Sequence, residues 1–254
     1  MHNSIWLNRE NAKALIMFVH GFMGSPSQFS DLLEDVYKRG CSACAVLLPG
    51  HGGTGQDFVR CGLADWEDHL QEELDKYTPA YPKIILAGHS MGGLLALNAS
   101  LHKRNNISGV FLLSSPLKIN FSPFSLLRRL VRLTYPVNNH IKATYRQAMS
   151  LSNIALSPRW AKPMYGFFRL MRKTKLNLPR VFVPVLAIHS RQDETVAFKS
   201  ADKIYNGLRN NIKKRLTLEK SWHAYYTPEE WAMVRAVLLE YIGDCLEDKT
   251  QLQN

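Results

Sequence analysis

The sequence predicts an α/β protein with a mostly parallel central sheet that carries helices on both faces. Three observations support this fold class. Short, continuously apolar runs recur along the chain, which is typical of strands buried on both faces. Stretches with helical periodicity lie between them, as in successive βαβ units. The length of 254 residues, of which 46% are hydrophobic, suits one large domain of this kind.

The predicted elements alternate between strand and helix along the chain. Strands are expected at 15–20, 43–48, 83–87, 110–113, 183–188 and 215–219, with room for at most one strand before them. Helices are expected at 27–39, 65–77, 93–99, 199–208 and 228–246. Most of these helices carry apolar residues on one face, and Gly40 ends the first of them. Strands and helices that alternate in this way form a parallel sheet covered on both faces.

The segment 117–178 breaks the alternation. It contains no strand-like run, and its prolines divide it into short helical pieces. These prolines are Pro123, Pro136, Pro158 and Pro163. Because the segment lies between two sheet strands, we predict a helical cap inserted after the sixth-strand region and folded over the strand ends. The core then comprises residues 1–116 and 179–254.

The charge of the chain is unevenly distributed. The formal net charge is +11, and the stretch 76–192 contains 18 of the 32 Lys and Arg residues and none of the 21 acidic residues. Two interpretations are open: a solvated basic face, or a positive rim that attracts an anionic substrate or makes transient contact with an anionic lipid surface. Apolar residues and arginines mix at 124–133 and 165–173, which fits helices packed on the core or a lid that contacts lipid. We expect no nucleic-acid partner, because no recognised binding motif accompanies the charge. The oligomeric state is not indicated.

The sequence also predicts a cytoplasmic protein. The first ten residues lack the charged-then-apolar pattern of a secretion signal, and no apolar run approaches the roughly 20 residues of a membrane span. Cys41 and Cys44 have the spacing of a redox motif, but they lead into a strand instead of opening a helix. We therefore interpret the four cysteines as free thiols in a reducing compartment.

The pattern Gly-x-Ser-x-Gly at 88–92 is the most informative motif of the chain. A strand-like run precedes it, and helix-forming residues follow it. This strand, sharp turn and helix hold Ser90 at the end of the sheet in a strained conformation, above a helix N-terminus that favours a developing anion. The glycines are needed because the strand and the helix nearly touch. The context predicts a nucleophilic serine, and an idle serine in a tight turn is the alternative.

Ser90 needs a general base, because an unassisted hydroxyl is a poor nucleophile. His223 follows the last predicted strand and precedes the terminal helix, so it is the candidate base. Asp193 comes soon after the preceding strand and is the candidate acid that orients His223. Glu194 is adjacent but projects in a different direction, and Glu219 is too close to His223 along the chain. The order serine, acid, histidine is associated with this type of turn.

Two amide groups are expected to stabilise the oxyanion of a tetrahedral intermediate. One belongs to Met91, the residue after the nucleophile, and the other to Phe22 in the loop His-Gly-Phe-Met-Gly that follows the first predicted strand. Gly21 leaves room for substrate in this loop. His51 and His89 are also candidate substrate-site residues. Alternatively, His51 hydrogen-bonds to the backbone and His89 is structural.

These motifs, together with Pro-Gly-His-Gly at 49–52 and Asp-x-x-Val at 193–196, resemble those of the α/β-hydrolase superfamily. The similarity is greatest to its bacterial carboxylesterases and monoacylglycerol-lipase-like enzymes, and it spans about 15–241 outside the cap. The resemblance implies hydrolysis of acyl esters through an acyl-serine intermediate, with no cofactor and no metal. It does not extend to the basic cap.

The sequence therefore predicts a serine hydrolase that cleaves small-molecule carboxylic esters with short-to-medium acyl chains. Thioesterase, lysophospholipase or monoacylglycerol lipase activity is the alternative within the enzyme class. A non-enzymatic module that binds a ligand or lipid on the same fold is the alternative outside it. A pure binding protein does not need a nucleophile, a base, an acid and oxyanion donors together, which favours the enzyme.

Overall fold

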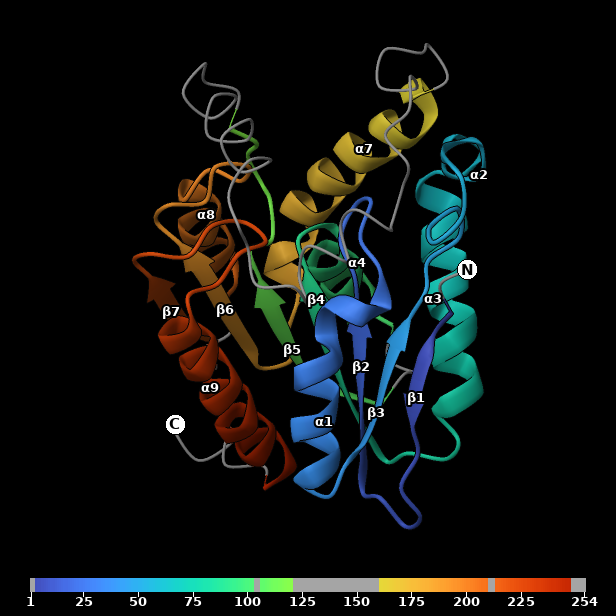
Figure 1. The fold of residues 1–254 in the computed structure, drawn as a ribbon, viewed down its shortest axis with the longest axis vertical. Coiled ribbons are helices and arrows are strands. Elements are labelled where there is room, and N and C mark those ends of the chain that lie inside the picture. The colour runs from blue at the N-terminus through green and yellow to red at the C-terminus, as the bar shows by residue number, and fades with distance from the viewer. Residues whose placement is uncertain (1–2, 103–105, 121–159, 210–212, 248–254) are drawn as a thin grey trace.

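The computed structural model describes residues 3–102, 106–120, 160–209 and 213–247. Their centre is a seven-stranded sheet in the order β1-β3-β2-β4-β5-β6-β7 (Figure 1). Only β1 is antiparallel to its neighbour, and every other pairing is parallel. The predicted fold class, a mostly parallel sheet with helices on both faces, is confirmed.

The strands lie close to the predicted ranges. They are β1 Ile5–Leu7, β2 Ala14–Val19, β3 Ser42–Val46, β4 Lys83–His89, β5 Ile107–Leu113, β6 Val185–Ser190 and β7 Lys213–Leu218. The continuously apolar strands β2 and β3 are buried along their whole length, because helices cover both faces of the sheet. The short strand β1 fills the place left for one strand before β2.

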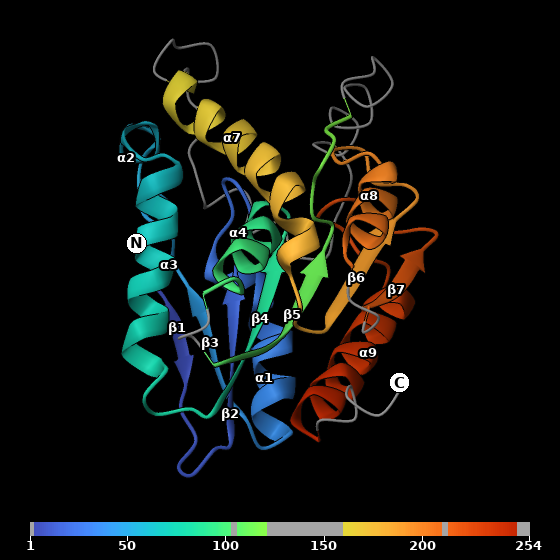
Figure 2. The same ribbon diagram turned by 180° about the vertical axis from the view of Figure 1, so that it is seen from behind.

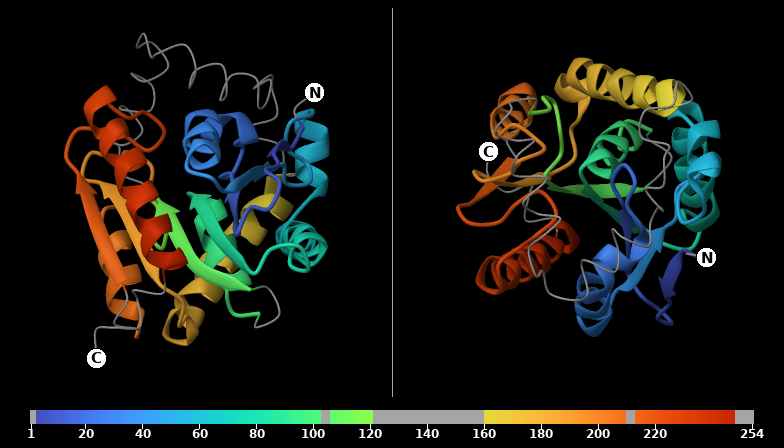
Figure 3. Two further views of the ribbon diagram at one scale, coloured as in Figure 1. Left: turned by 90° about the horizontal axis from the view of Figure 1, so that it is seen from below. Right: turned by 45° about the horizontal axis from the view of Figure 1, so that its top comes forward.

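One face of the sheet is covered by α1 Ser30–Lys38 and α9 Pro228–Leu246, which stand in front in Figure 1. Leu33 of α1 and Leu238 of α9 belong to the same buried cluster as Phe18 of β2. In the right view of Figure 3 the sheet separates these two helices from α4, α7 and α8.

The opposite face carries α3 Leu63–Tyr77, α4 Met91–Ala99, α7 Ala161–Asn177 and α8 Lys199–Gly207 (Figure 2). The helix α4 is buried on all sides, because it lies directly behind β4 with α3 and α7 outside it. A short helix, α2 Gly55–Arg60, precedes α3 and was not predicted. Trp66 of α3 and Phe167 of α7 join the buried cluster of this face.

The described parts of the predicted cap are 117–120 and 160–178, and the helix α7 makes up most of the second part; residues 121–159 lie outside the described ranges. The helix is longer than the short helical pieces predicted there, and the expected break at Pro163 is absent. Pro163 lies in the first turn of α7, where the missing N–H removes no helical hydrogen bond. The helix packs against α2, α3 and α4, and the segment lies between β5 and β6. The cap and core boundaries remain a prediction.

The parallel topology brings several loops to one edge of the sheet. The arrows of β2, β4, β5 and β6 all point toward the end of the molecule where α7 begins (Figure 1). The loops that follow β2, β4, β6 and β7 therefore meet there, although they come from four separate regions of the sequence. Among the helices in the described ranges, none has the length and apolar character needed to cross a membrane.

Candidate active site

Ser90 lies in the sharp turn between β4 and α4. Its backbone has φ 53° and ψ −120°, a strained conformation for a residue with a side chain. A Cβ on Gly88 would overlap the backbone of Gly93, and a Cβ on Gly92 would overlap the carbonyl group of Val19. The two glycines of the motif therefore let the strand and the helix approach closely enough to hold this turn.

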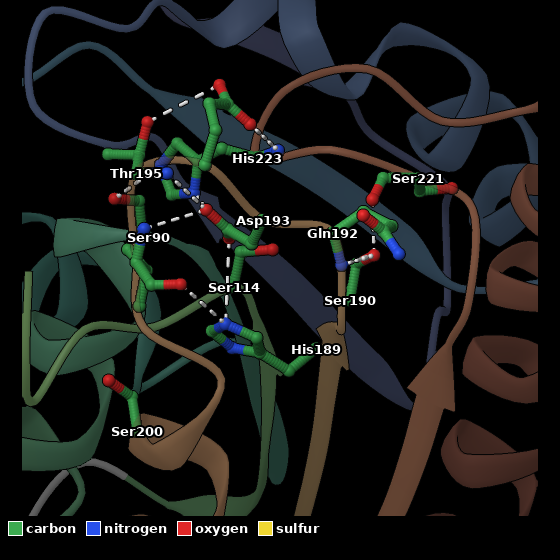
Figure 4. Close-up of polar contacts among 12 residues, drawn as sticks. Ser90, Ser114, His189, Ser190, Gln192, Asp193, Thr195, Ser200, Ser221 and His223 are labelled. Carbon is green, nitrogen blue, oxygen red and sulfur yellow. Dashed lines mark hydrogen bonds and ion pairs between the residues drawn. The ribbon is translucent and has the colours of Figure 1, made fainter. Parts of the chain in front are cut away.

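A continuous chain of hydrogen bonds joins Ser90, His223 and Asp193 (Figure 4). The Nε2 atom of His223 lies 3.1 Å from Oγ of Ser90, and its Nδ1 atom lies 2.8 Å from Oδ2 of Asp193. All three residues are buried. Because an ionised carboxylate only accepts, Nδ1 carries the proton, which leaves Nε2 free to accept from the serine hydroxyl.

The environment of Asp193 keeps its carboxylate ionised. Its Oδ1 atom accepts hydrogen bonds from the amides of Thr195 and Val196, at 2.9 and 2.7 Å (Figure 4). Burial raises the pKa of Asp193, but His223, His189 and the Val196 amide together outweigh burial, so the pKa lies below its ordinary value. The acid can therefore orient His223 without taking its proton.

His189 is a second histidine on the same carboxylate. Its Nε2 atom lies 3.6 Å from Oδ2 of Asp193 and 3.4 Å from the carbonyl oxygen of Val196. Burial lowers the pKa of His189 more than Asp193 raises it, which favours the neutral ring. These contacts give His189 a structural role beside Asp193.

The loop that carries His223 is anchored from several elements. Glu230, in the first turn of α9, accepts hydrogen bonds from the amides of Glu219, Lys220 and Ser221. Ser190 donates to the carbonyl oxygen of Ser221. These contacts fix the backbone directly before His223.

Two further side chains bind the peptide groups of His223 itself. Glu194 accepts from its amide at 3.0 Å, and Nε2 of His89 lies 2.9 Å from its carbonyl oxygen. Glu194 thus binds the main chain of His223, whereas Asp193 binds the ring, so the two side chains project in different directions, as the sequence predicted. His89 contacts the backbone of the histidine loop, which supports the structural alternative for this residue. Glu219 pairs with Arg191 at the surface, at 3.0 Å, and not with His223.

The loop after β2 lies directly against Ser90. A Cβ on Gly21 would stand 2.9 Å from Cβ of Ser90, so only glycine leaves this approach open. The ring of Phe22 packs on Phe58 and Phe167, with ring centroids 4.9 and 5.3 Å apart. As the first residue of α4, Met91 has an amide with no acceptor inside its own helix.

Two buried histidines hold this loop in place. The amide of Leu48 donates to Nε2 of His20 at 3.0 Å, so Nδ1 of His20 donates to the carbonyl oxygen of Gly21 at 2.9 Å. The amide of Met23 donates to Nε2 of His51 at 3.2 Å, so Nδ1 of His51 donates to the carbonyl oxygen of Pro49. Both rings are thus neutral and link the loops that follow β2 and β3.

These contacts decide between the two interpretations of His51. Both of its nitrogens are engaged by the backbone, and burial lowers the pKa of His51 from 6.5 to about 4. The ring therefore fits the alternative in which it hydrogen-bonds to the backbone, and not a role as a substrate ligand.

Several residues with structural roles at this site had no role in the sequence prediction, among them His20, Glu194 and Glu230. Each acts on the backbone of a residue that is distant in the sequence or lies on another loop, so no local pattern marks it. Glu230 carries one readable signal, since an acidic residue at the third position of a helix that begins after Thr227 is typical of a capping arrangement. In the described ranges, no cluster of three or more histidine, cysteine or carboxylate side chains is arranged to hold a metal ion.

Comparison with known proteins places the chain in a family. The sequence model of the family described as serine aminopeptidase, S33, matches residues 10–229. The chain belongs to this S33 family. The thermostable monoacylglycerol lipase of Bacillus sp. (strain H-257) is 26% identical over 236 residues, which are 92% of each chain. The carboxylesterase of Bacillus subtilis (strain 168) is 21% identical over 228 residues, covering 89% of this chain and 91% of that protein.

A solved structure of a metagenome-derived lipolytic enzyme has the same fold. It aligns with a TM-score of 0.72 at 21% identity and covers 94% of this chain and 97% of that one. The resemblance to the α/β-hydrolase superfamily, and to its lipases and esterases, is therefore confirmed. This S33-family member is a hydrolase of that superfamily, in a serine hydrolase family.

Proposed function

We propose that this protein hydrolyses carboxylic esters with short-to-medium acyl chains, with Ser90 as the nucleophile. The observation that carries the proposal is the hydrogen-bonded chain from Ser90 through His223 to Asp193, with distances of 3.1 and 2.8 Å. The strained turn at Ser90 places its hydroxyl at the carboxyl edge of the sheet, where the loops of the other two residues also lie. Such a set can activate a serine without a cofactor or metal.

The reaction proceeds in two halves. Ser90 attacks the ester carbonyl as His223 takes its proton, and Asp193 stabilises the imidazolium that forms. The amides of Phe22 and Met91 hold the oxyanion, because the loop at Gly21 abuts Ser90 and α4 begins at Met91. His223 then returns the proton to the leaving alcohol. A water molecule, activated by the same histidine, attacks the acyl-serine and releases the acid.

Monoacylglycerol lipase activity is the second candidate within this chemistry. The 26% identity to a bacterial monoacylglycerol lipase, over 92% of both chains, favours it. Thioesterase and lysophospholipase activities would use the same residues on a different leaving group. A ligand-binding module without activity is less well supported, because it has no use for a serine, a histidine and a carboxylate joined in this order.

We also propose transient contact with a lipid surface through the outward side of α7. Tyr165, Phe168 and Leu176 are 66%, 42% and 69% exposed there. Arg169 and Arg172 lie among them, and together they line a groove of about 540 Å³. The inner side of the same helix places Phe167 on Phe22. The helix thus connects the outer surface with the loop beside Ser90.

The test compares the wild-type protein with the variant Ser90→Ala. A fluorophosphonate probe should label Ser90 in the wild type, as located by mass spectrometry. Turnover of p-nitrophenyl esters should fall on the order of 10⁴-fold or more in the variant while the thermal unfolding midpoint stays close to that of the wild type. The turnover of esters of increasing acyl length, and of a monoacylglycerol, then shows which substrate the protein prefers. An adduct on Ser114 or Ser221 would contradict the assignment.

A further inference from the structure

His223 makes hydrogen bonds through its main chain as well as its ring, and one of its partners is a second carboxylate. Asp193 binds Nδ1 of the ring at 2.8 Å, while Glu194 binds the backbone amide at 3.0 Å. Nε2 of His89 lies 2.9 Å from the backbone carbonyl oxygen. Of these two consecutive acidic residues, Asp193 therefore contacts the side chain of His223 and Glu194 contacts its main chain.

The burial of the Glu194 carboxylate needs a physical explanation. The residue is 2% exposed, and a buried carboxylate is unfavourable unless hydrogen bonds or charges compensate it. A neutral side chain could accept the same amide hydrogen bond at lower desolvation cost. The negative charge is placed instead beside the residue that becomes positively charged when it takes the serine proton.

We propose that Glu194 is a second carboxylate of the active site, with two effects on His223. It positions the ring by fixing the backbone amide, and its charge stabilises the imidazolium in the transition state. The proposal rests on the proposed function, because it assumes that His223 is the base. Glu194 touches no reacting atom, so it is a positioning residue that also acts through its charge.

The other titratable groups around His223 come from three elements. Asp193 and His189 belong to β6 and the loop after it, His89 ends β4, and Tyr226 approaches from the start of α9 with its hydroxyl 3.4 Å from the carbonyl oxygen of His223. Among the described residues that contact His223, the two acidic ones are Asp193 and Glu194. Removing one of these two charges should therefore change the protonation of His223 measurably.

The variant Glu194→Gln separates charge from shape. Its amide oxygen can still accept from the His223 amide, whereas Glu194→Ala removes the acceptor as well. The matched control is Glu219→Gln, which removes an exposed carboxylate near the start of the same loop. The readouts are kcat and KM for a neutral ester, the pH profile of kcat/KM, and the thermal unfolding midpoint.

For Glu194→Gln we expect kcat to fall about tenfold at neutral pH and KM to stay unchanged. The acid limb of the profile should move about one pH unit lower, since an imidazolium with less stabilisation loses its proton at lower pH. Glu194→Ala should lose more activity, and Glu219→Gln should match the wild type. If Glu194→Ala does not fold, Glu194→Gln still provides the test.

The outcomes separate this proposal from the proposed function. A wild type whose Ser90 is not labelled by fluorophosphonate would overturn the function itself. A wild type that is labelled and active, with a Glu194→Gln variant of unchanged kcat and unchanged pH profile, would overturn the role of Glu194 alone.

Discussion

At the scale of single residues, the candidate site is a hydrogen-bonded set of Ser90, His223 and Asp193 that neighbouring side chains hold in place. Ser90 and His223 are marked by the turn motif and by the loop before the last helix. Asp193 and Glu194 are adjacent, and only the direction of a side chain separates a ring partner from a main-chain partner. That direction follows from the turn after β6, where the amides of Thr195 and Val196 bind the Asp193 side chain.

The role of Asp193 yields a prediction. Asp193→Asn should lower kcat on the order of 10⁴-fold, because a neutral amide no longer holds the Nδ1 proton of His223 and no longer stabilises its imidazolium. Ester turnover and fluorophosphonate labelling both measure the loss. Glu219→Gln, the surface partner of Arg191, is the control and should keep full activity. A control as damaged as the variant would mean that the acid is misassigned.

Gly21 yields a second prediction at this scale. The Cβ of Gly21→Ala would stand 2.9 Å from Cβ of Ser90 and 3.2 Å from Nδ1 of His89, and His20 holds the loop so that it cannot withdraw. We expect kcat for a small ester to fall about tenfold or more, because the serine or the oxyanion amides are displaced. Gly243→Ala in α9 is the matched control, since its Cβ would meet only Arg39, at 3.6 Å. Equal activity in the two variants would contradict the close approach.

At the scale of elements, a helix was predictable where local signals agree with its packing. The helix predicted at 228–246 is α9, with Thr227 as its N-cap, Pro228 in its first turn and apolar residues turned to the sheet. The helix α2 has only six residues, too few for an apolar period, and the capping box of Thr54 and Asp57 supports it. Links between loops, such as those made by His20 and His51, depend on the tertiary structure and leave no local pattern.

His51 links the loops after β2 and β3, and this link makes the free energy of unfolding depend on pH. The pKa of His51 is about 4 in the folded state and about 6.5 in the unfolded chain, so the unfolded chain binds more protons between these values. The contribution of His51 to stability is complete above pH 6.5 and is lost as the pH falls toward 4. The shift corresponds to about 3 kcal/mol.

His51→Gln should therefore flatten the pH dependence of the unfolding free energy in this window, although it lowers stability at neutral pH by removing the backbone contacts. Thermal or urea unfolding at a series of pH values measures both effects. His102→Gln, which changes an exposed histidine outside this network, is the control. Parallel pH curves for the wild type and His51→Gln would contradict the assignment.

At the scale of the whole molecule, the meeting of distant loops was predictable from topology alone. A parallel sheet places the carboxyl ends of its strands at one edge, so Ser90, Asp193 and His223 had to lie near one another. The charge pattern did not decide between a solvated basic face and a rim that attracts an anionic partner, because the acidic helix α3 lies beside the basic helix α7. Lys173 pairs with Glu67 at 2.7 Å and Lys162 with Asp65 at 3.4 Å, so part of the basic excess is compensated within the fold.

Two exposed arginines on the outward side of α7 provide a test of the proposed lipid contact. Arg169 and Arg172 should be changed together to Gln, which is polar but carries no charge. The change removes two exposed positive charges, so binding to vesicles of anionic lipid should weaken several-fold at low salt. The difference should fade as salt shortens the screening length to about 8–10 Å near physiological ionic strength. Vesicle sedimentation measures the binding, and turnover of a small neutral ester should stay unchanged.

Three further arginines of the predicted cap, Arg128, Arg129 and Arg132, lie outside the described residues, and changing all three to Gln gives a second variant for the same assay. The double variant Lys38→Gln and Arg39→Gln, at the end of α1 on the other face of the sheet, removes the same number of exposed positive charges and controls for the loss of net charge. If the α7 variant and this control bind anionic vesicles equally, the outward side of α7 is only a solvated basic face. If turnover of the neutral ester falls together with vesicle binding, the two arginines instead support the packing of α7 over Phe22. A contact between α7 and a lipid surface would not change the hydrolysis of a small ester that is free in solution.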